Sequence, residues 1–185
     1  MIISLEEMLK MNLKDEVFII ETDTVYGMGC LYNSRKGAER ILKIKNRSEN
    51  KFFSLLVSNL EQVSSLTEGF NDSIDLVNNY WPGAVTFIFK KSSLVPPYVT
   101  SSNEVGLRMP DNNRTLKAIE KFGPLIMTSV NMSGEDAITK FNECLKFENK
   151  VDFIVKGKDL SNVPSTVYDI TTRKVLRQGS VIINL

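Results

Sequence analysis

The sequence predicts an α/β protein built on a twisted, mixed parallel and antiparallel open sheet, with flanking helices and one concave ligand groove. Short apolar runs alternate with amphipathic segments, but not strictly, which favours a mixed sheet over a regular doubly wound one. Small polar or basic residues follow several of the apolar runs, and ligands of open α/β sheets collect at strand ends. The chain has 185 residues, 42% of them hydrophobic, which suffices for one sizeable core. We therefore expect a single domain over residues 1–185.

The first segments of the chain show how each element is assigned. Ser4 and Glu7 form the Ser-x-x-Glu pattern of a capping box, which predicts a short helix after Ser4. Residues 17–20 form a compact apolar run, which predicts a buried strand. Over residues 34–45 apolar positions recur at helical spacing between charged ones, which predicts an amphipathic helix. Its apolar positions Ile41, Leu42 and Ile44 are expected to be buried.

The later segments follow the same rules. Pro and Gly end helices, so Trp81-Pro82-Gly83 and Gly123-Pro124 end the helices predicted at residues 72–80 and 115–122. Apolar runs predict strands at residues 52–57, 85–89, 105–109, 125–127, 151–155, 166–170 and 181–183.

Composition and charge exclude several function classes. Lys and Arg number 23 against 22 Asp and Glu, so a net charge of +1 provides no overall attraction to a polyanion. The sequence has no histidine, which excludes histidine bases, Ser-His-Asp triads and histidine-ligated zinc. Cys30 and Cys144 are far apart and lack a CxxC partner, so two buried or half-buried thiols are expected. Neither a Walker-type phosphate loop nor a GxGxxG motif occurs, so a nucleotide would need another binding device.

The sequence also indicates where the protein is located. Its apolar runs are too short to cross a bilayer. The first twelve residues carry Glu6, Glu7 and Lys10 and lack the uninterrupted apolar stretch of a secretion signal. A soluble, cytoplasmic protein without membrane contact is therefore expected.

A basic cluster, Lys45-Asn46-Arg47 with Lys51, follows the helix predicted at residues 34–45, and two interpretations are open. Basic residues near a helix C-terminus interact favourably with its dipole, so the cluster can be a solvated helix end. Alternatively it is a cationic fork for phosphates, because Arg offers bidentate hydrogen bonds and Lys a mobile point charge. The cluster alone does not decide between them.

Polar residues after apolar runs have a similar double interpretation. They can form turns and helix caps, or they can bind the phosphates and ribose of a nucleotide. Trp81-Pro82-Gly83 is instead interpreted as a rigid packing corner. The polar segments concerned are Thr128-Ser129-Val130-Asn131-Met132-Ser133-Gly134, Pro164-Ser165-Thr166 and Leu176-Arg177-Gln178-Gly179.

The order of seven short blocks decides between these interpretations. Each block alone is weak, but in this order, over residues 21–179, they resemble the YrdC/TsaC family of threonylcarbamoyl-AMP synthases in its short, single-domain form. The blocks are Thr22-Asp23-Thr24-Val25-Tyr26-Gly27-Met28-Gly29, Lys45-Asn46-Arg47, Trp81-Pro82-Gly83, Val105-Gly106-Leu107-Arg108-Met109-Pro110, Thr128-Ser129-Val130-Asn131-Met132-Ser133-Gly134, Pro164-Ser165-Thr166-Val167 and Leu176-Arg177-Gln178-Gly179.

Several positions depart from the family pattern, but none removes a polar group that the chemistry needs. The departures are Glu21 where the family usually has Pro, Phe52 for the Pro after Lys51, Ala84 for a second Pro after Trp-Pro-Gly, residues 111–113 for a His-Pro pair, and Val130 for a small Ala.

The resemblance implies a YrdC-like fold and a nucleotidyltransferase activity. L-threonine, bicarbonate and ATP would give threonylcarbamoyl-adenylate and pyrophosphate, for the threonylcarbamoyladenosine modification of tRNA. This chemistry needs charge neutralisation and in-line positioning but no protein nucleophile, so the lack of histidine is compatible with it. Mg²⁺ would be carried mainly by the ATP phosphates and water, so no protein ligands are expected. The implied partners are the threonylcarbamoyl-transferase machinery and, as an open option, tRNA.

The resemblance also implies roles for particular residues of this sequence. Arg108 would pair with the threonine carboxylate, because a planar guanidinium matches two oxygens. The implied L-threonine site consists of Thr24, Arg108 and Ser165, the ATP site of Arg47, Lys51, Ser129, Asn131 and Arg177, and the catalytic pair of Lys45 and Arg47.

Two other functions remain open at this point. An RNA- or tRNA-binding module of the same fold would show steeply salt-dependent RNA binding without ATP turnover, but the near-neutral charge speaks against it. A carbamoyl-adenylating domain of the hydrogenase-maturation kind would be accompanied by a zinc-finger region, which two cysteines and no histidine cannot form.

Overall fold

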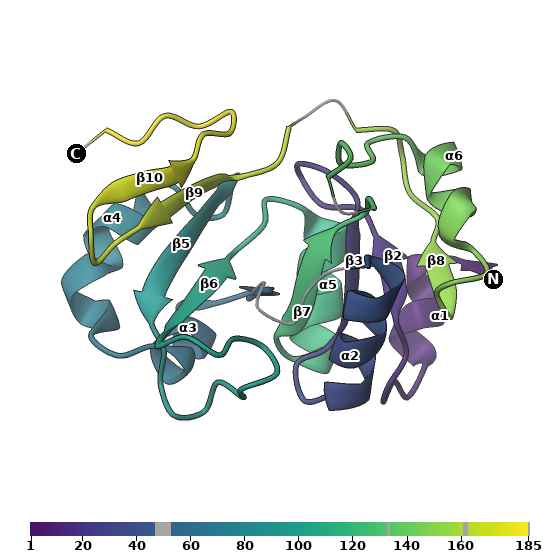
Figure 1. The fold of residues 1–185 in the computed structure, drawn as a ribbon, viewed down its shortest axis with the longest axis horizontal. Coiled ribbons are helices and arrows are strands. Elements are labelled where there is room, and N and C mark those ends of the chain that lie inside the picture. The colour runs from purple at the N-terminus through teal and green to yellow at the C-terminus, as the bar shows by residue number, and fades with distance from the viewer. Residues whose placement is uncertain (47–52, 133, 161–162, 185) are drawn as a thin grey trace.

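The strands of the protein form one continuous sheet. The computed structural model describes residues 1–46, 53–132, 134–160 and 163–184. Within them the strands are β1 (Ile2–Ile3), β2 (Phe18–Ile20), β3 (Gly27–Leu31), β4 (Ser54–Leu56), β5 (Val85–Lys90), β6 (Glu104–Arg108), β7 (Leu125–Ser129), β8 (Phe153–Val155), β9 (Thr166–Asp169) and β10 (Lys174–Arg177). Their order in the sheet is β1-β8-β2-β3-β7-β4-β6-β5-β9-β10 (Figure 1).

The sheet is mixed, which confirms the predicted fold class. Strand pairs β1–β8, β2–β8, β4–β6 and β5–β9 are parallel. The pairs β2–β3, β3–β7, β4–β7, β5–β6 and β9–β10 are antiparallel. Several neighbours in the sheet are far apart in the chain, so its middle brings together segments from the whole sequence.

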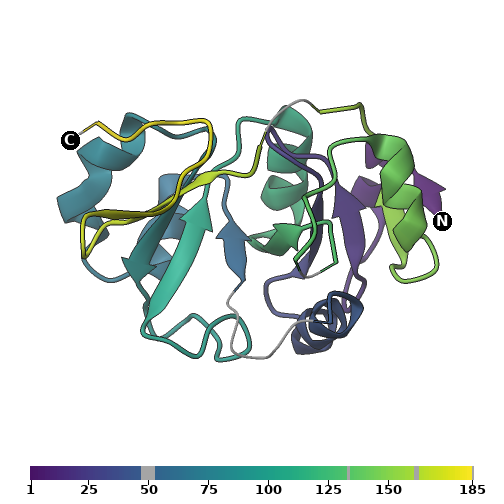
Figure 2. The same ribbon diagram turned by 45° about the horizontal axis from the view of Figure 1, so that its top comes forward.

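Helices cover both faces of the sheet (Figures 1 and 2). They are α1 (Leu5–Lys10), α2 (Arg35–Ile44), α3 (Leu60–Leu66), α4 (Ile74–Asn78), α5 (Asn113–Phe122) and α6 (Phe141–Cys144), with the 3₁₀ helices η1 (Phe70–Ser73) and η2 (Leu145–Phe147). Helices α1 and α5 pack in one hydrophobic cluster and α2 in another. In β2 the side chains of Phe18 and Ile20 belong to the first cluster and that of Ile19 to the second, as strand alternation requires.

Two predicted helices follow directly from local sequence. The capping box forms at α1, where the Glu7 amide donates to Ser4 Oγ (3.1 Å) and the Ser4 amide donates to Glu7 Oε2 (2.6 Å). Ser34 caps α2, and Ile41 on this helix is fully buried. Ile44 and Leu42 are only partly buried, although they pack against the core.

The sequence missed β3 because of its glycines. A glycine weakens a strand, yet it is required where another chain segment comes close. A Cβ on Gly27 would lie 2.4 Å from Met127 Sδ, and one on Gly29 would lie 2.6 Å from Ile126 O. These residues therefore let β3 pair closely with β7.

Helix α3 was also missed, and the helix predicted at residues 72–80 is η1 followed by α4.

The strand predicted at residues 181–183 is wrong. This segment is irregular, and β10 precedes it. Side chains bind its backbone in place of a ladder: the hydroxyl of Thr166 donates to Val181 O (2.6 Å), and the Asn184 amide donates to Tyr80 Oη (2.8 Å). Among the helices of the described residues, none is long and apolar enough to cross a membrane.

Candidate active site

Polar side chains from distant segments of the chain meet at one cavity near the middle of the sheet. The segments are the turn after β2, the end of α2, the ends of β6 and β7, and the start of β9 with the end of β10. The cavity has a volume of about 280 Å³ and is lined by hydroxyl groups and three cationic side chains. Seven of the nine predicted site residues line it: Thr24, Lys45, Arg108, Ser129, Asn131, Ser165 and Arg177. The other two, Arg47 and Lys51, lie outside the described residues.

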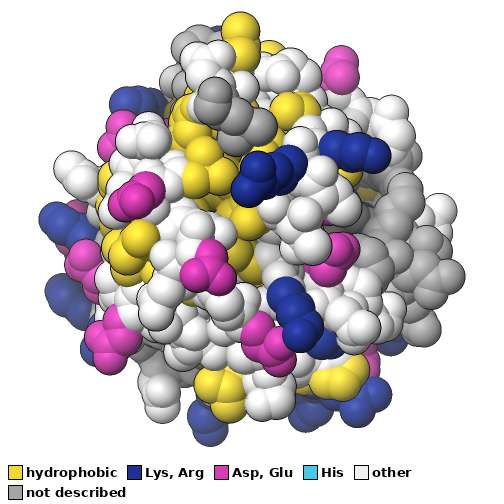
Figure 3. Space-filling model, turned by 90° about the vertical axis from the view of Figure 1, so that its left-hand side faces the viewer, with side chains coloured by type: hydrophobic (Ala, Val, Ile, Leu, Met, Phe, Trp, Pro, Cys, Tyr) yellow, Lys and Arg dark blue, Asp and Glu magenta, His cyan; other side chains and the backbone are white. Residues whose placement is uncertain are grey.

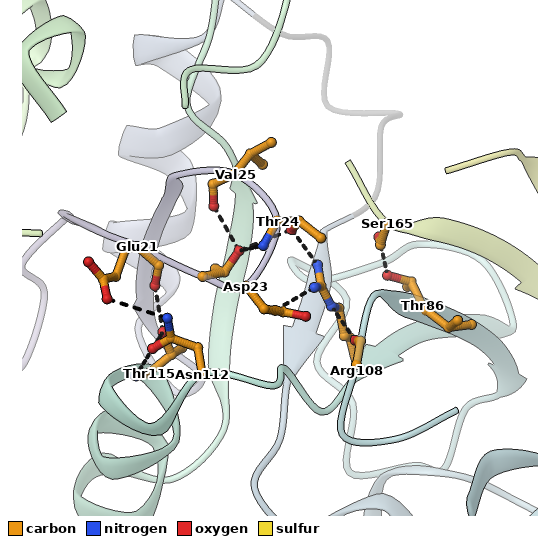
Figure 4. A network of polar contacts seen from close by, with 12 residues as sticks. Glu21, Asp23, Thr24, Val25, Thr86, Arg108, Asn112, Thr115 and Ser165 are labelled. Atoms are coloured by element: carbon orange, nitrogen blue, oxygen red, sulfur yellow. Dashed lines mark hydrogen bonds and ion pairs between the residues drawn. The ribbon is translucent and has the colours of Figure 1, made fainter. Parts of the chain in front are cut away.

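Arg108 is the best-anchored of these side chains. It ends β6 and is only 6% exposed. Its Nε donates to Gly83 O (3.0 Å), Nη1 to Thr24 Oγ1 (2.9 Å) and Nη2 to Asp23 Oδ1 (2.5 Å) (Figure 4). Burial lowers the pKa of Arg108, and the nearby Asp23 carboxylate opposes that shift. The guanidinium is thus fixed in direction before any ligand arrives.

The turn after β2 places Thr24 against Arg108. The Thr22 hydroxyl accepts from the Thr24 amide (3.1 Å) and donates to Val25 O (2.7 Å), which closes the turn. This hydrogen bonding of a threonine to nearby backbone is a local feature that a sequence can indicate. The ion pair of Asp23 was missed, although a buried arginine needs a carboxylate partner and Asp23 lies in the same block.

A second polar network holds the start of that turn. Glu21 is 2% exposed, and its carboxylate is contacted by Arg114 Nε (3.3 Å), Asn112 Nδ2 (3.4 Å) and the Lys158 amide (3.0 Å). The Thr115 hydroxyl donates to Glu21 O (2.5 Å) (Figure 4). Glu21 and Asn112 both stand where the sequence departs from the family pattern. The side chains at these two positions are in contact, so together they hold this turn in place of the residues usual in the family.

Lys45 is buried, which is against the interpretation of this lysine as a solvated helix end. It follows α2 directly and is 4% exposed. Its Nζ donates to Ser129 O (2.6 Å), Asn131 O (3.0 Å) and Asn131 Oδ1 (2.5 Å). The ammonium thereby holds the loop after β7 against the cavity.

Ser129 and Asn131 complete this loop. The Ser129 hydroxyl donates to Asn131 Oδ1 (2.9 Å), and Asn131 Nδ2 donates to Glu135 O (2.6 Å). Gly134 has a φ of 94°, a backbone conformation that favours glycine. The side chains that form these turn bonds also line the cavity. The turn-forming and ligand-binding interpretations of this segment are therefore compatible.

Arg177 reaches the cavity from the other side. Its Nε and Nη2 donate to Ser165 O (3.0 and 2.8 Å), and Nη2 also donates to Ser165 Oγ (3.2 Å). Partial burial, and then the positive charge of Arg108, lower the pKa of Arg177. Two guanidinium groups that repel each other at one cavity are suited to bind an anion between them.

Ser165 precedes β9 instead of following a strand as predicted. Its hydroxyl pairs with that of Thr86 at 2.8 Å (Figure 4). Thr86 also lines the cavity, and no pattern in the sequence indicated it. Trp81-Pro82-Gly83 is a packing corner, as predicted: Trp81 is buried and its Nε1 donates to Val85 O (2.7 Å). The corner also orients Arg108 through Gly83 O.

An open mixed sheet with an arginine-lined cavity at its strand ends is typical of α/β proteins that bind small ligands at this place. The chain belongs to the Sua5/YciO/YrdC family. The family model, described as "Telomere recombination", matches residues 10–179. This confirms the resemblance found in the sequence.

Relatives with and without an assigned activity are about equally similar to the chain. A Pseudomonas fluorescens protein named threonylcarbamoyl-AMP synthase is 33% identical over 165 residues, which are 87% of this chain and 89% of the relative. The uncharacterized protein YciO of Escherichia coli is 31% identical over 173 residues, with 90% and 84% covered.

Solved structures show the same fold. P. abyssi Sua5 complexed with L-threonine superposes with a TM-score of 0.90 at 26% identity, over 97% of this chain. The chain spans 57% of that Sua5 chain. E. coli YciO superposes with a TM-score of 0.88 at 27% identity, with 97% of this chain and 90% of YciO covered.

Proposed function

We propose that this chain is an enzyme that makes threonylcarbamoyl-adenylate from L-threonine, bicarbonate and ATP, for the modification of adenosine in tRNA. The observation that carries the proposal is the convergence of Arg108, Arg177 and Lys45 on one hydroxyl-lined cavity. Relatives named threonylcarbamoyl-AMP synthase, and the Sua5 structure with L-threonine, support the same substrate class.

Threonine binds beside Arg108 in this proposal. The N–H groups of Arg108 that are not used by Asp23, Thr24 and Gly83 receive the threonine carboxylate. Thr24 and Ser165 flank that position and supply hydroxyl groups. Because Arg108 is already held by three partners, little conformational entropy is lost when the carboxylate binds.

ATP binds toward Arg177, Ser129 and Asn131. Arg177 offers charge to the phosphates, and the loop after β7 offers hydroxyl and amide groups. Arg47 and Lys51 are assigned to the phosphates by the resemblance alone. Among the described residues no group of three or more His, Cys, Asp or Glu side chains is placed to hold a metal ion. In this proposal Mg²⁺ enters on the ATP phosphates and water, a mode that this ion commonly uses.

The reaction requires two bond-forming steps. The threonine amine attacks the bicarbonate carbon and water leaves, which gives N-carboxy-threonine. A carboxylate oxygen of this carbamate then attacks the α-phosphorus of ATP, and pyrophosphate leaves with the electrons of the broken P–O bond. Lys45 and Arg47 are the proposed catalytic pair, because the two reacting anions repel each other unless nearby cations offset their charge.

The test is mass spectrometry of a reaction that contains the protein, ATP, Mg²⁺, threonine and labelled bicarbonate. We expect label in an AMP-containing product, and pyrophosphate release that depends on both threonine and bicarbonate. ATP consumption that is equal without threonine would contradict the proposal. Salt-dependent RNA binding with no ATP turnover would favour a binding module instead.

A further inference from the structure

Two hydroxyl groups form a buried pair at the wall of the active-site cavity. Thr86 lies on β5 and Ser165 directly precedes β9, and both residues line the cavity. Their side-chain oxygens are 2.8 Å apart (Figure 4), with Thr86 4% and Ser165 5% exposed. Ser165 has a proposed role in threonine binding, whereas Thr86 has none. The structure therefore gives Ser165 a partner that the proposed reaction does not yet explain.

The sheet itself holds the two hydroxyl groups together. Strands β5 and β9 are parallel, and Thr86 is the partner of Val167 in their ladder. The Thr166 amide donates to Ala84 O (3.0 Å), which fixes the chain directly after Ser165. Because ladder hydrogen bonds keep neighbouring strands at a constant spacing, the distance between the two hydroxyl groups is set before any ligand binds.

Arg177 contacts Ser165 as well, but from an exposed strand. Its Nη2 donates to Ser165 Oγ (3.2 Å). All four residues of β10 are exposed. Figure 3 views the molecule from the side on which β10 and α4 lie, and hydrophobic and charged side chains mix at the surface there. Thr86, in contrast, comes from β5, which has a neighbouring strand on each side. Thr86 is therefore the more rigid of these two partners of Ser165.

The number of protons available shows which hydroxyl of the pair donates. A hydroxyl has one proton and two lone pairs, whereas a guanidinium can only donate, so Arg177 occupies a lone pair of Ser165 Oγ. An ionised carboxylate only accepts, so Ser165 can bind the threonine carboxylate only with its own proton. The hydrogen bond between the two hydroxyl groups is then donated by Thr86. This arrangement also gives the buried Thr86 proton an acceptor.

We infer that Thr86 is a positioning residue for threonine: its hydroxyl donates to Ser165 Oγ and thereby directs the Ser165 proton at the carboxylate of the substrate. The inference rests on the proposed function, because it takes Ser165 to contact threonine. Linked hydrogen bonds polarise one another, so the two bonds that Ser165 accepts also make it a stronger donor to the ligand.

The inference is tested by the kinetics of adenylate formation in Thr86→Val and Thr86→Ser. Valine has nearly the shape of threonine without the hydroxyl, and serine keeps the hydroxyl. In Thr86→Val the KM for threonine should rise about tenfold while kcat and the KM for ATP stay unchanged, because the carboxylate does not react. In Thr86→Ser the KM for threonine should stay within about twofold of the unmodified value. An unchanged threonine KM in Thr86→Val, or one in Thr86→Ser as high as in Thr86→Val, would overturn the inference.

Thr67→Val is the matched control for loss of stability. Thr67 is 6% exposed, its hydroxyl donates to Val63 O (2.8 Å), and it does not line the cavity. Both valine variants lose one buried hydroxyl bond, so both should unfold at a lower temperature than the unmodified chain. The threonine KM should rise in Thr86→Val alone. An equal rise in Thr67→Val would assign the effect to stability and overturn the inference.

A double-mutant cycle separates positioning from direct contact. Ser165→Ala should raise the threonine KM, and Thr86→Val should add no further rise in that variant, because Thr86 acts through Ser165. Losses that add would place Thr86 against the substrate itself and overturn the inference. An unmodified chain that makes no adenylate would contradict the proposed function, and the inference with it. An active unmodified chain whose variants depart from this pattern would contradict the inference alone.

Discussion

The two sides of the active-site cavity are built differently. Around Arg108 the groups are buried: Arg108 is 6% exposed, Ser165 5% and Thr24 1%. On the opposite side, all four residues of β10 are exposed, and Ser165 is the hydrogen-bond partner of Arg177 within the described residues. The side proposed for threonine is therefore organised by the fold itself, whereas the side that offers Arg177 to the nucleotide can adjust when a ligand binds. Substitutions should affect stability on the first side and mainly activity on the second.

Arg108→Ala should have the largest effect. It removes the nearly buried guanidinium that pairs with Asp23 at 2.5 Å, and removing one member of such an ion pair typically costs about 3–5 kcal/mol in the free energy of unfolding. Denaturant unfolding measures this loss, and Arg35→Ala is the control, because its exposed pair with Glu39 contributes about 1 kcal/mol at most. Equal losses of unfolding free energy in the two variants would show that the buried contacts of Arg108 stabilise the protein no more than an exposed ion pair does.

The role of Arg108 in threonine binding is tested on a folded variant. Arg108→Lys keeps a positive charge beside Asp23 but cannot make the planar, two-bond contact with a carboxylate. We expect about 2 kcal/mol or more of threonine affinity to be lost, with ATP binding retained. Calorimetric titrations of both ligands measure this, and unchanged threonine affinity would contradict the assignment.

Lys45→Ala should lower both turnover and stability. Turnover should fall about a hundredfold, the usual effect of losing one preorganised electrostatic group. The free energy of unfolding should fall by about 1–3 kcal/mol, because three hydrogen bonds to the loop after β7 are lost. Pyrophosphate release and thermal unfolding on one preparation give both values. The control is Lys43→Ala, because Lys43 is exposed on the same helix, and this variant should change neither turnover nor the free energy of unfolding. Full activity of folded Lys45→Ala would show that Lys45 is only structural.

Arg177→Ala should change activity with little change in stability. The residue lies on an exposed strand and binds only Ser165 among the described residues, so the free energy of unfolding should fall by about 1 kcal/mol. The KM for ATP should rise about tenfold, since one charged hydrogen bond to a phosphate is lost. Lys174→Ala on the same strand is the control for kinetics. A stability loss as large as that of Arg108→Ala would mean that the two sides of the cavity are alike.

The smallest effect is expected at the two thiols. Burial raises the pKa of Cys30 and of Cys144 to about 12, and both residues lie outside the active-site cavity. Because the thiolate is the reactive form, iodoacetamide at pH 8 should leave both cysteines unmodified in the folded protein. Mass spectrometry checks this, with the denatured chain as the reactive control. Rapid labelling without denaturant would show that the regions around Cys30 and Cys144 unfold locally in the native protein.

Local sequence rules predicted the elements that depend on local contacts. The cap at Ser4 was predicted because it bonds to an amide three residues away, and the cap at Ser34, which was not predicted, has the same spacing. The glycine-rich β3 was not, because its glycines serve a contact with β7 about a hundred residues later. The failure at residues 181–183 has the same cause, since distant side chains take the backbone bonds that a strand would need.

The active site was predictable as a set of residues but not as a geometry. Block order selected Thr24, Arg108 and Ser165, which the structure brings to one cavity, while their contact with threonine stays a prediction. It did not reveal that Lys45 is buried or that Asp23 orients Arg108, since both facts depend on which side chains meet in space. The contact between Glu21 and Asn112 joins positions 91 residues apart, which a single sequence cannot show.

The position of β8 has a consequence for how the protein is made. This strand, residues Phe153–Val155, lies between β1 and β2 and pairs with both in parallel. While the ribosome synthesises the chain, β1 and β2 have no partner on their facing edges until about five sixths of the sequence has been translated. Strand edges left open in this way favour association with other chains. The facing edges of the first two strands therefore stay open to association until β8 emerges and pairs with both.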